Sequence, residues 1–168
     1  MRAGRDERAR VRGAQRGSAS DLEALFRAHW PRAYRAAYLV THDAAAAEDI
    51  AQESFLAAIR ALDRFDRGRP FGPWLHRIAV NRAIDWARAR RLRSEVELSE
   101  SLPAPPRDPP GDDVLAALAR LSPEHRAVIV MRYVLEFTPG EIAEALDLPR
   151  GTVNSRLRRG LDSLAEEL

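Results

Sequence analysis

The stretch that decides the fold is Thr138-Pro-Gly-Glu-Ile-Ala-Glu-Ala-Leu-Asp-Leu-Pro-Arg-Gly-Thr-Val-Asn-Ser-Arg-Leu-Arg-Arg-Gly160. Thr138, followed by Pro139 and by Glu141, is the pattern of a capping box with proline at the first helical position, so a short helix begins there. Asp147 tolerates the left-handed conformation that a tight turn after this helix needs. A second helix follows the turn. This helix-turn-helix pattern is typical of proteins that place the second helix in the major groove of DNA.

The second helix of this motif is expected to have two different faces. Apolar side chains repeat at helical spacing and are expected to face the core: Val153, Leu157, Leu161 and Leu164. Polar side chains lie on the other side: Asn154, Ser155, Arg158, Arg159 and Asp162. Arginine can bind guanine through two hydrogen bonds and asparagine can bind adenine, so this face is a candidate for reading bases. The alternative interpretation is an ordinary amphipathic helix with a solvated basic face.

The composition limits the kinds of protein that the chain can be. Its 168 residues leave room for one domain or two small ones, not for a large enzyme. The absence of cysteine excludes disulfides and thiolate metal sites, and fits a cytoplasmic protein. No apolar run is long enough to span a membrane, and the polar, arginine-rich N-terminus does not resemble a secretory signal. The net charge is only +2, but the charges are distributed unevenly along the chain.

Helical spacing of apolar residues predicts three helices in residues 20–93. The first is expected to begin at a capping box that Ser20 opens, and to be kinked or split at Pro31. The second is expected to begin at Asp43, and the third to run from about Gly72 to Arg93.

The composition also divides the chain into segments. Residues 1–19 are arginine-rich with few apolar side chains, and are predicted to be a disordered arm. Residues 94–112 are acidic and carry five prolines, which predicts an extended linker. Residues 113–168 are predicted to form a second helical unit that ends with the helix-turn-helix. The predicted fold class is therefore all-α, with two small helical domains joined by a proline-rich acidic linker.

Four segments carry a resemblance to a known family: Ala47–Leu56, Phe71–Arg88, Leu121–Arg126 and Gly151–Arg159. In this order they resemble region 2.2, regions 2.3 and 2.4, and region 4 of bacterial RNA polymerase sigma factors of the extracytoplasmic-function (ECF) type in the sigma-70 family. The sequence departs from the family pattern at Asp147, where glycine is common, and at Gly160, where alanine is usual. Gly160 weakens the second helix of the helix-turn-helix by up to about 1 kcal/mol. The resemblance implies a subunit that binds core RNA polymerase and directs transcription initiation at promoters.

The resemblance implies three groups of site residues. Those expected to bind the polymerase are Asp49, Gln52 and Glu53. Those expected at the melted −10 element, together with the turn at 66–71, are Phe71, Trp74, Arg77, Asn81 and Arg88. Those expected at the duplex −35 element are Arg150, Thr152, Asn154, Ser155, Arg158 and Arg159. Asn81 can bind a base edge, and Arg77 and Arg88 can follow the phosphates of an opened strand. Phe71 and Trp74 could stack on bases, but core packing is the expected use of both.

Two other classes of protein compete with this interpretation. One is a free-standing helix-turn-helix regulator, although the first domain resembles region 2 rather than a dimerisation or ligand-binding domain. The other is an enzyme, but no phosphate-binding glycine loop or nucleophile motif occurs. The histidines are scattered without metal-ligand spacing: His29, His42, His76 and His125. We therefore expect no catalysis, metal, cofactor or small-molecule substrate. A partner that remains open is an anti-sigma factor, which would have to cover the polymerase-binding or DNA-binding faces.

Overall fold

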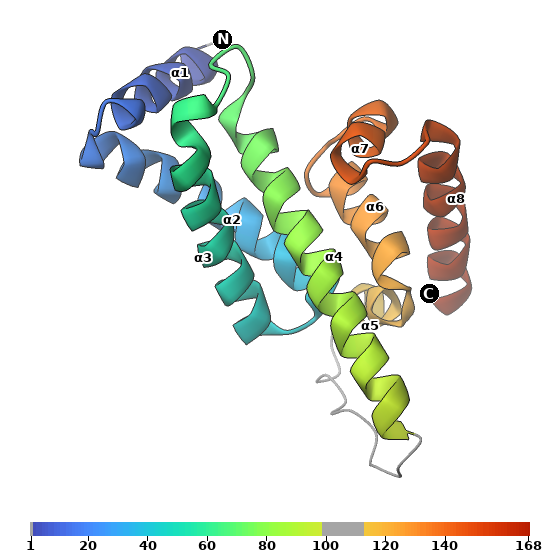
Figure 1. Cartoon of the computed structure of the whole chain (residues 1–168). Coiled ribbons are helices and arrows are strands. Elements are labelled where there is room, and N and C mark those ends of the chain that lie inside the picture. Colours follow the sequence, from blue (N-terminus) through green and yellow to red (C-terminus); the bar gives the residue numbers. More distant parts are fainter. Residues whose placement is uncertain (1, 99–112) are drawn as a thin grey trace.

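The computed structural model describes residues 2–98 and 113–168, and every regular element in these two ranges is a helix. The helices are α1 (Arg2–Gln15), α2 (Ala19–Thr41), α3 (Ala44–Ala61), the short 3-10 helix η1 (Leu62–Arg64), α4 (Phe71–Leu98), α5 (Asp113–Arg120), α6 (Pro123–Tyr133), α7 (Pro139–Leu146) and α8 (Arg150–Glu167). Figure 1 shows α2, α3 and α4 packed together in the first half, with α1 across one end. Helices α6, α7 and α8 form a second group beside α4 (Figure 1). The predicted all-α class with two helical domains is confirmed.

Side-chain caps set the start of four helices. The side chains of Ser18, Asp43, Ser122 and Thr138 accept a hydrogen bond from the backbone N–H three residues later. Each bond satisfies an amide that has no partner inside its helix. The starts expected at Asp43 and Thr138 are confirmed, whereas α2 begins one residue before Ser20 and is capped by Ser18.

Two clusters of buried side chains form the core. One lies within the first half and joins α1, α2, α3 and α4 around Phe55, Phe65 and Leu75. The larger cluster continues from the first half into the second, and combines Val40 and Val80 with buried residues of α5 to α8. The core of the second domain is therefore continuous with part of the core of the first. The two domains pack directly against each other, mainly α2 and α4 against α6.

The structure differs from the sequence predictions at both ends of the first domain. The segment 1–19, expected to be a disordered arm, contains α1, and Val11 of this helix is 2% exposed. Burial of Val11 against the domain stabilises a helix that is too short to be stable alone in water. Helix α4 continues to Leu98, so 94–98 belongs to a helix rather than to the linker. The remaining linker prediction, for 99–112, lies outside the described residues.

Helix α2 also passes through Pro31 without a break, so the predicted split does not occur. Proline removes one backbone hydrogen bond and crowds the preceding turn. Buried alanines on the following turns, Ala33, Ala36 and Ala37, anchor the helix on the core and keep it continuous.

Candidate nucleic-acid interface

Helices α7 and α8 form the predicted helix-turn-helix. The capping box at the start of α7 is complete, because Thr138 N–H donates to Glu141 Oε2 at 2.7 Å and Glu141 N–H donates to Thr138 Oγ1 at 3.3 Å. Asp147 adopts the left-handed conformation, with φ of 52°. The next amide, Leu148 N–H, donates to Ala143 O at 2.9 Å and closes the turn. The chain is thereby redirected into α8 at Arg150.

The inner face of α8 differs in part from the predicted stripe. Val153 and Leu157 are buried as expected, whereas Leu161 is exposed and Gly160 is buried instead. A Cβ atom at position 160 would lie only 2.7 Å from Ile129 Cδ1 of α6. The glycine therefore allows α8 to approach α6 closely.

The outer face of α8 carries the residues expected at the −35 element. Arg150, Asn154, Arg158 and Arg159 are exposed, and Thr152 and Ser155 are half-buried. No ion pair to another described residue occupies any of the three arginines on this face. Arginines without acidic partners can bind phosphates and guanine edges without first losing an ion pair.

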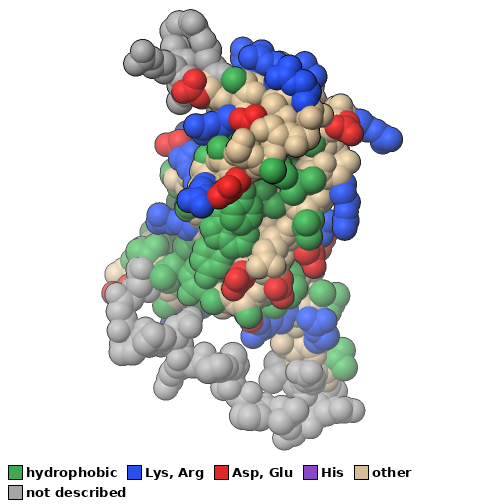
Figure 2. Space-filling model, turned by 90° about the vertical axis from the view of Figure 1, so that its left-hand side faces the viewer, with side chains coloured by type: hydrophobic (Ala, Val, Ile, Leu, Met, Phe, Trp, Pro, Cys, Tyr) green, Lys and Arg blue, Asp and Glu red, His purple; other side chains and the backbone are tan. Residues whose placement is uncertain are grey.

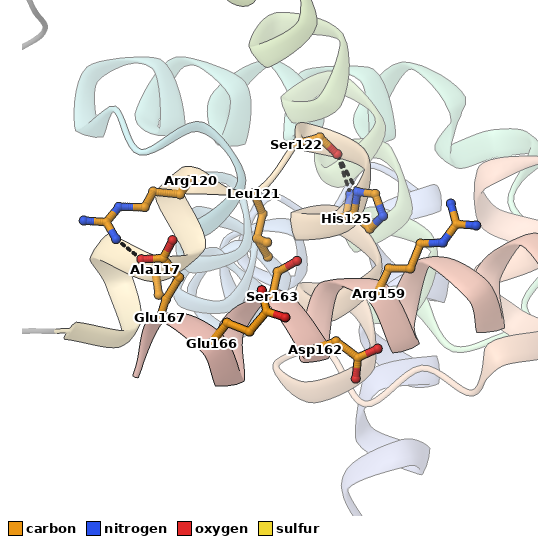
Figure 3. A pocket seen from close by; sticks show the side chains of 10 residues that line it. All are labelled: Ala117, Arg120, Leu121, Ser122, His125, Arg159, Asp162, Ser163, Glu166 and Glu167. Carbon is orange, nitrogen blue, oxygen red and sulfur yellow. Dashed lines mark hydrogen bonds and ion pairs between the residues drawn. The ribbon is translucent and has the colours of Figure 1, made fainter.

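A pocket of about 550 Å³ lies behind this face, between α5, α6 and α8, and Arg159 is at its rim (Figure 3). The Ser122 hydroxyl and His125 Nδ1 lie 2.6 Å apart in it. Burial, and then the charge of Arg156, lower the pKa of His125, so its ring is neutral at neutral pH. An ion pair between Arg120 and Glu167 closes the far end. The described residues contain no group of His, Cys, Asp and Glu that could hold a metal ion.

The aromatic residues expected at the −10 element pack in the core. Phe71 is 3% exposed, and its ring centroid lies 5.8 Å from that of Phe65. The buried ring is not available for stacking on a base in this conformation, which agrees with the expected core packing of Phe71. Trp74 is half-buried and packs 4.5 Å from Phe65 between ring centroids.

The polar residues expected at the −10 element lie along α4, where the second domain contacts them. Asn81 Nδ2 donates to Ala145 O of α7 at 3.1 Å. Arg88 Nε donates to Glu124 Oε1 of α6 at 2.6 Å, whereas Arg77 is exposed. In this arrangement the second domain covers part of the surface that would read an opened strand.

Further acidic side chains of the second domain meet arginines of the first. Arg69 lies 3.5 Å from Glu144, and Arg32 lies 3.1 Å from Glu136, nitrogen to oxygen. A cleft of about 240 Å³ between α4 and α7 runs beside the first of these pairs. The carboxylates occupy cationic groups that could otherwise bind nucleic-acid phosphates.

The residues expected to bind the polymerase lie together on α3. Asp49, Gln52 and Glu53 are exposed on one flank of this helix. Glu53 Oε2 also accepts a hydrogen bond from Arg82 Nη1 of α4 at 3.0 Å. Ordinary helical spacing brings the three side chains together, as predicted.

The prediction missed an apolar patch on the same side of the first domain. Leu56 is 50% exposed, Ile59 is 41% exposed and Phe26 of α2 is 39% exposed. Figure 2 shows that hydrophobic side chains form a broad band on the side of the molecule where α3 lies, with acidic side chains along its border. The sequence signal was present, because the apolar residues of α3 are too many for one buried face.

Comparison with known proteins identifies the family. Residues 25–93 match the family model of sigma-70 region 2, and residues 111–164 match that of sigma-70 region 4. The chain is 37% identical over 166 aligned residues to the ECF RNA polymerase sigma factor SigL of Mycobacterium tuberculosis, covering 93% of each chain. It is 30% identical to the ECF RNA polymerase sigma factor SigW of Bacillus subtilis, covering 95% of each chain. The structure of CnrH in complex with the cytosolic domain of CnrY aligns with a TM-score of 0.72 at 28% identity, covering 96% of each chain. With both regions in order on one chain and relatives matched over most of their length, this chain belongs to the ECF sigma factors of RNA polymerase, in the sigma-70 family.

Proposed function

We propose that this sigma factor binds core RNA polymerase through α3, reads a melted −10 element with the turn at 66–70 and α4, and reads a duplex −35 element with α8. One observation carries the proposal. The arginine and asparagine face of α8 is exposed and makes no ion pair to another described residue, on a chain whose other domain matches sigma-70 region 2. A free-standing regulator would not need that domain.

The polymerase-binding face combines charge with apolar area. Asp49, Gln52 and Glu53 border the exposed side chains of Leu56 and Ile59. An apolar centre with a polar rim is the usual composition of a protein–protein interface. We assign core polymerase to this surface. An anti-sigma factor that blocked the chain would have to cover this surface or the arginine face of α8.

The chain contributes binding and no catalytic step of its own. The ECF family consists of transcription initiation factors, and the polymerase supplies the chemistry. None of the described helices is long and apolar enough to cross a membrane. We propose that the protein acts in the cytoplasm, where the polymerase works.

The primary test is transcription in vitro with purified core polymerase on genomic fragments. We expect promoter-dependent transcripts only when the chain is added. Gel shifts without polymerase separate the two interpretations of the helix-turn-helix. A sigma factor binds duplex promoter weakly alone, whereas a free-standing regulator binds it tightly and produces no polymerase-dependent transcript.

The polymerase-binding face is tested by changing Asp49, Gln52 and Glu53 together to Ala. Alanine favours helix, so the helix content should be preserved, while the affinity for core polymerase should fall by about tenfold or more. The matched control is Asp85→Ala, which removes an exposed carboxylate of α4. Normal affinity of the triple variant for core polymerase would contradict the assignment of this face.

A further inference from the structure

Helix α1 lies outside both matched family regions, yet it is an integral part of the first domain. Val11 is buried in the same cluster as Phe71. At Gly13, α1 and α2 approach so closely that a Cβ atom on this glycine would collide with the carboxylate of Asp21 in α2. Figure 1 shows α1 beside the segment that connects α3 to α4, which contains the proposed −10 turn.

The last residue of α1 is bonded to the beginning of that connecting segment. Gln15 Nε2 donates to Leu62 O at 2.8 Å and to Phe65 O at 3.3 Å. Its Oε1 accepts a hydrogen bond from Arg67 Nε at 2.5 Å. One amide side chain therefore binds the 3-10 helix, the residue before the turn and the turn itself.

The first half of α1 is bonded to the end of the same segment. Glu7 Oε2 accepts a hydrogen bond from Phe71 N–H at 3.3 Å, and Glu7 Oε1 lies 2.8 Å from His29 Nε2. Phe71 is the first residue of α4, where amides have no partner inside the helix and a carboxylate is favoured by the helix dipole. Glu7 thus caps α4 from a helix far away in sequence.

The turn between these two anchored ends presents polar groups to solvent. Arg67, Gly68 and Arg69 are exposed. Gly68 N–H donates to Asp66 Oδ1 at 2.8 Å, and Arg69 N–H donates to Asp66 O at 3.0 Å, so the turn also has internal bonds. A loop that is already ordered loses less conformational freedom when it binds a ligand.

We propose that α1 is a clasp that holds the turn at 66–70 in the conformation that receives the melted −10 strand, with Gln15 and Glu7 as positioning residues. This inference rests on the proposed function of the turn. Neither side chain needs to touch DNA. Loss of either side chain leaves one end of the turn unanchored. This lowers both the affinity for the opened strand and the preference for its sequence, without changing the polymerase-binding face on α3.

The test uses the full-length chain in holoenzyme with Gln15→Ala and Glu7→Ala. A fork-junction promoter that carries a single-stranded −10 element reports capture of the opened strand. We expect binding to fall about five- to tenfold for each variant, as for the loss of one or two hydrogen bonds, and the preference for the correct −10 sequence to shrink. Affinity for core polymerase should not change. The conservative variant Glu7→Gln keeps an oxygen that can accept from Phe71 N–H, and should restore binding.

Two controls make the outcomes distinguishable. Asp6→Ala removes an exposed carboxylate next to Glu7 and should bind the fork like the unmodified chain. Changing Arg67 and Arg69 together to Ala tests the turn itself. Loss of −10 preference in this double variant, with normal preference in the Gln15 and Glu7 variants, would overturn the clasp alone. Normal preference in all of them would overturn the proposed function of the turn.

A measurement on the free protein tests the clasp without DNA. In Gln15→Ala, amide hydrogen exchange should accelerate in residues 62–71 and stay unchanged in α8. Unchanged exchange in 62–71 would show that α1 does not order the turn, and would overturn the inference.

Discussion

His76 should make the stability of the first domain dependent on pH. This residue of α4 is 3% exposed, and its Nε2 meets no hydrogen-bond partner among the described residues. Its ring centroid lies 5.9 Å from that of His29. Burial, and then the neighbouring charges of His29 and Arg32, lower the pKa of His76 from 6.5 to about 4. The fold therefore requires the neutral imidazole.

The sign and size of the effect follow from linkage. Because the pKa of His76 is lower in the folded protein, the unfolded chain binds protons more readily, and folding stability falls as pH drops from 6.5 toward about 4. The full pKa difference corresponds to about 3 kcal/mol, of which about 2 kcal/mol is lost between pH 7.5 and pH 5. His29 adds to the loss in the same direction, because burial lowers its pKa in spite of Glu7.

The measurement is urea unfolding followed by circular dichroism at about pH 7.5 and about pH 5, for the unmodified chain and for His76→Phe. The variant should lose about 2 kcal/mol less stability between the two pH values, whatever its stability at the higher pH. Ala79→Gly in the same helix is the control, since it should cost about 1 kcal/mol equally at both pH values. An identical pH dependence in His76→Phe and the unmodified chain would refute the reasoning.

Four other substitutions test the helix-turn-helix and the packing of the first domain. At least one of the two holoenzymes that carry Arg158→Ala or Arg159→Ala should lose about 1–3 kcal/mol of binding free energy on the preferred −35 sequence, and much less on a sequence changed at the contacted base pair. Unchanged −35 preference in both would reject α8 as the reading helix. Thr138→Ala removes the cap of α7 and should lower the free energy of unfolding by about 1 kcal/mol, measured by thermal unfolding. An unchanged midpoint of the thermal transition would mean that the cap does not limit stability. At Gly72 a Cβ atom would lie 2.8 Å from His29 Cε1, so Gly72→Ala should destabilise the domain by about 1–3 kcal/mol; a variant as stable as the unmodified chain would show that the His29 ring can move aside.

Local sequence signals predicted the α-helices from α2 onward and the helix-turn-helix, because caps and turns depend on a few neighbouring residues. Thr138, Asp147 and Asp43 act as their residue types suggest. Helix α1 was missed because its intrinsic signal is weak, and it is stabilised by burial of Val11 and by distant bonds such as that of Gln15 to Leu62 O. A window of neighbouring residues contains neither kind of information.

The packing of the two domains could not be predicted for a related reason. Alanines of the shared core, such as Ala36, Ala83 and Ala127, allow helices to approach closely but do not specify which helices meet. The choice of partner is made by pairs far apart in sequence, such as Asn81 with Ala145 O and Arg88 with Glu124. These same residues of α4 are the ones that the family resemblance assigns to the −10 element. A residue cannot bind the second domain and an opened DNA strand with the same atoms, so the proposed reading of a promoter by α4 would require these contacts to break. The sequence could therefore name the residues of α4 that are candidates for binding the −10 element, but only the structure shows what they bind when DNA is absent.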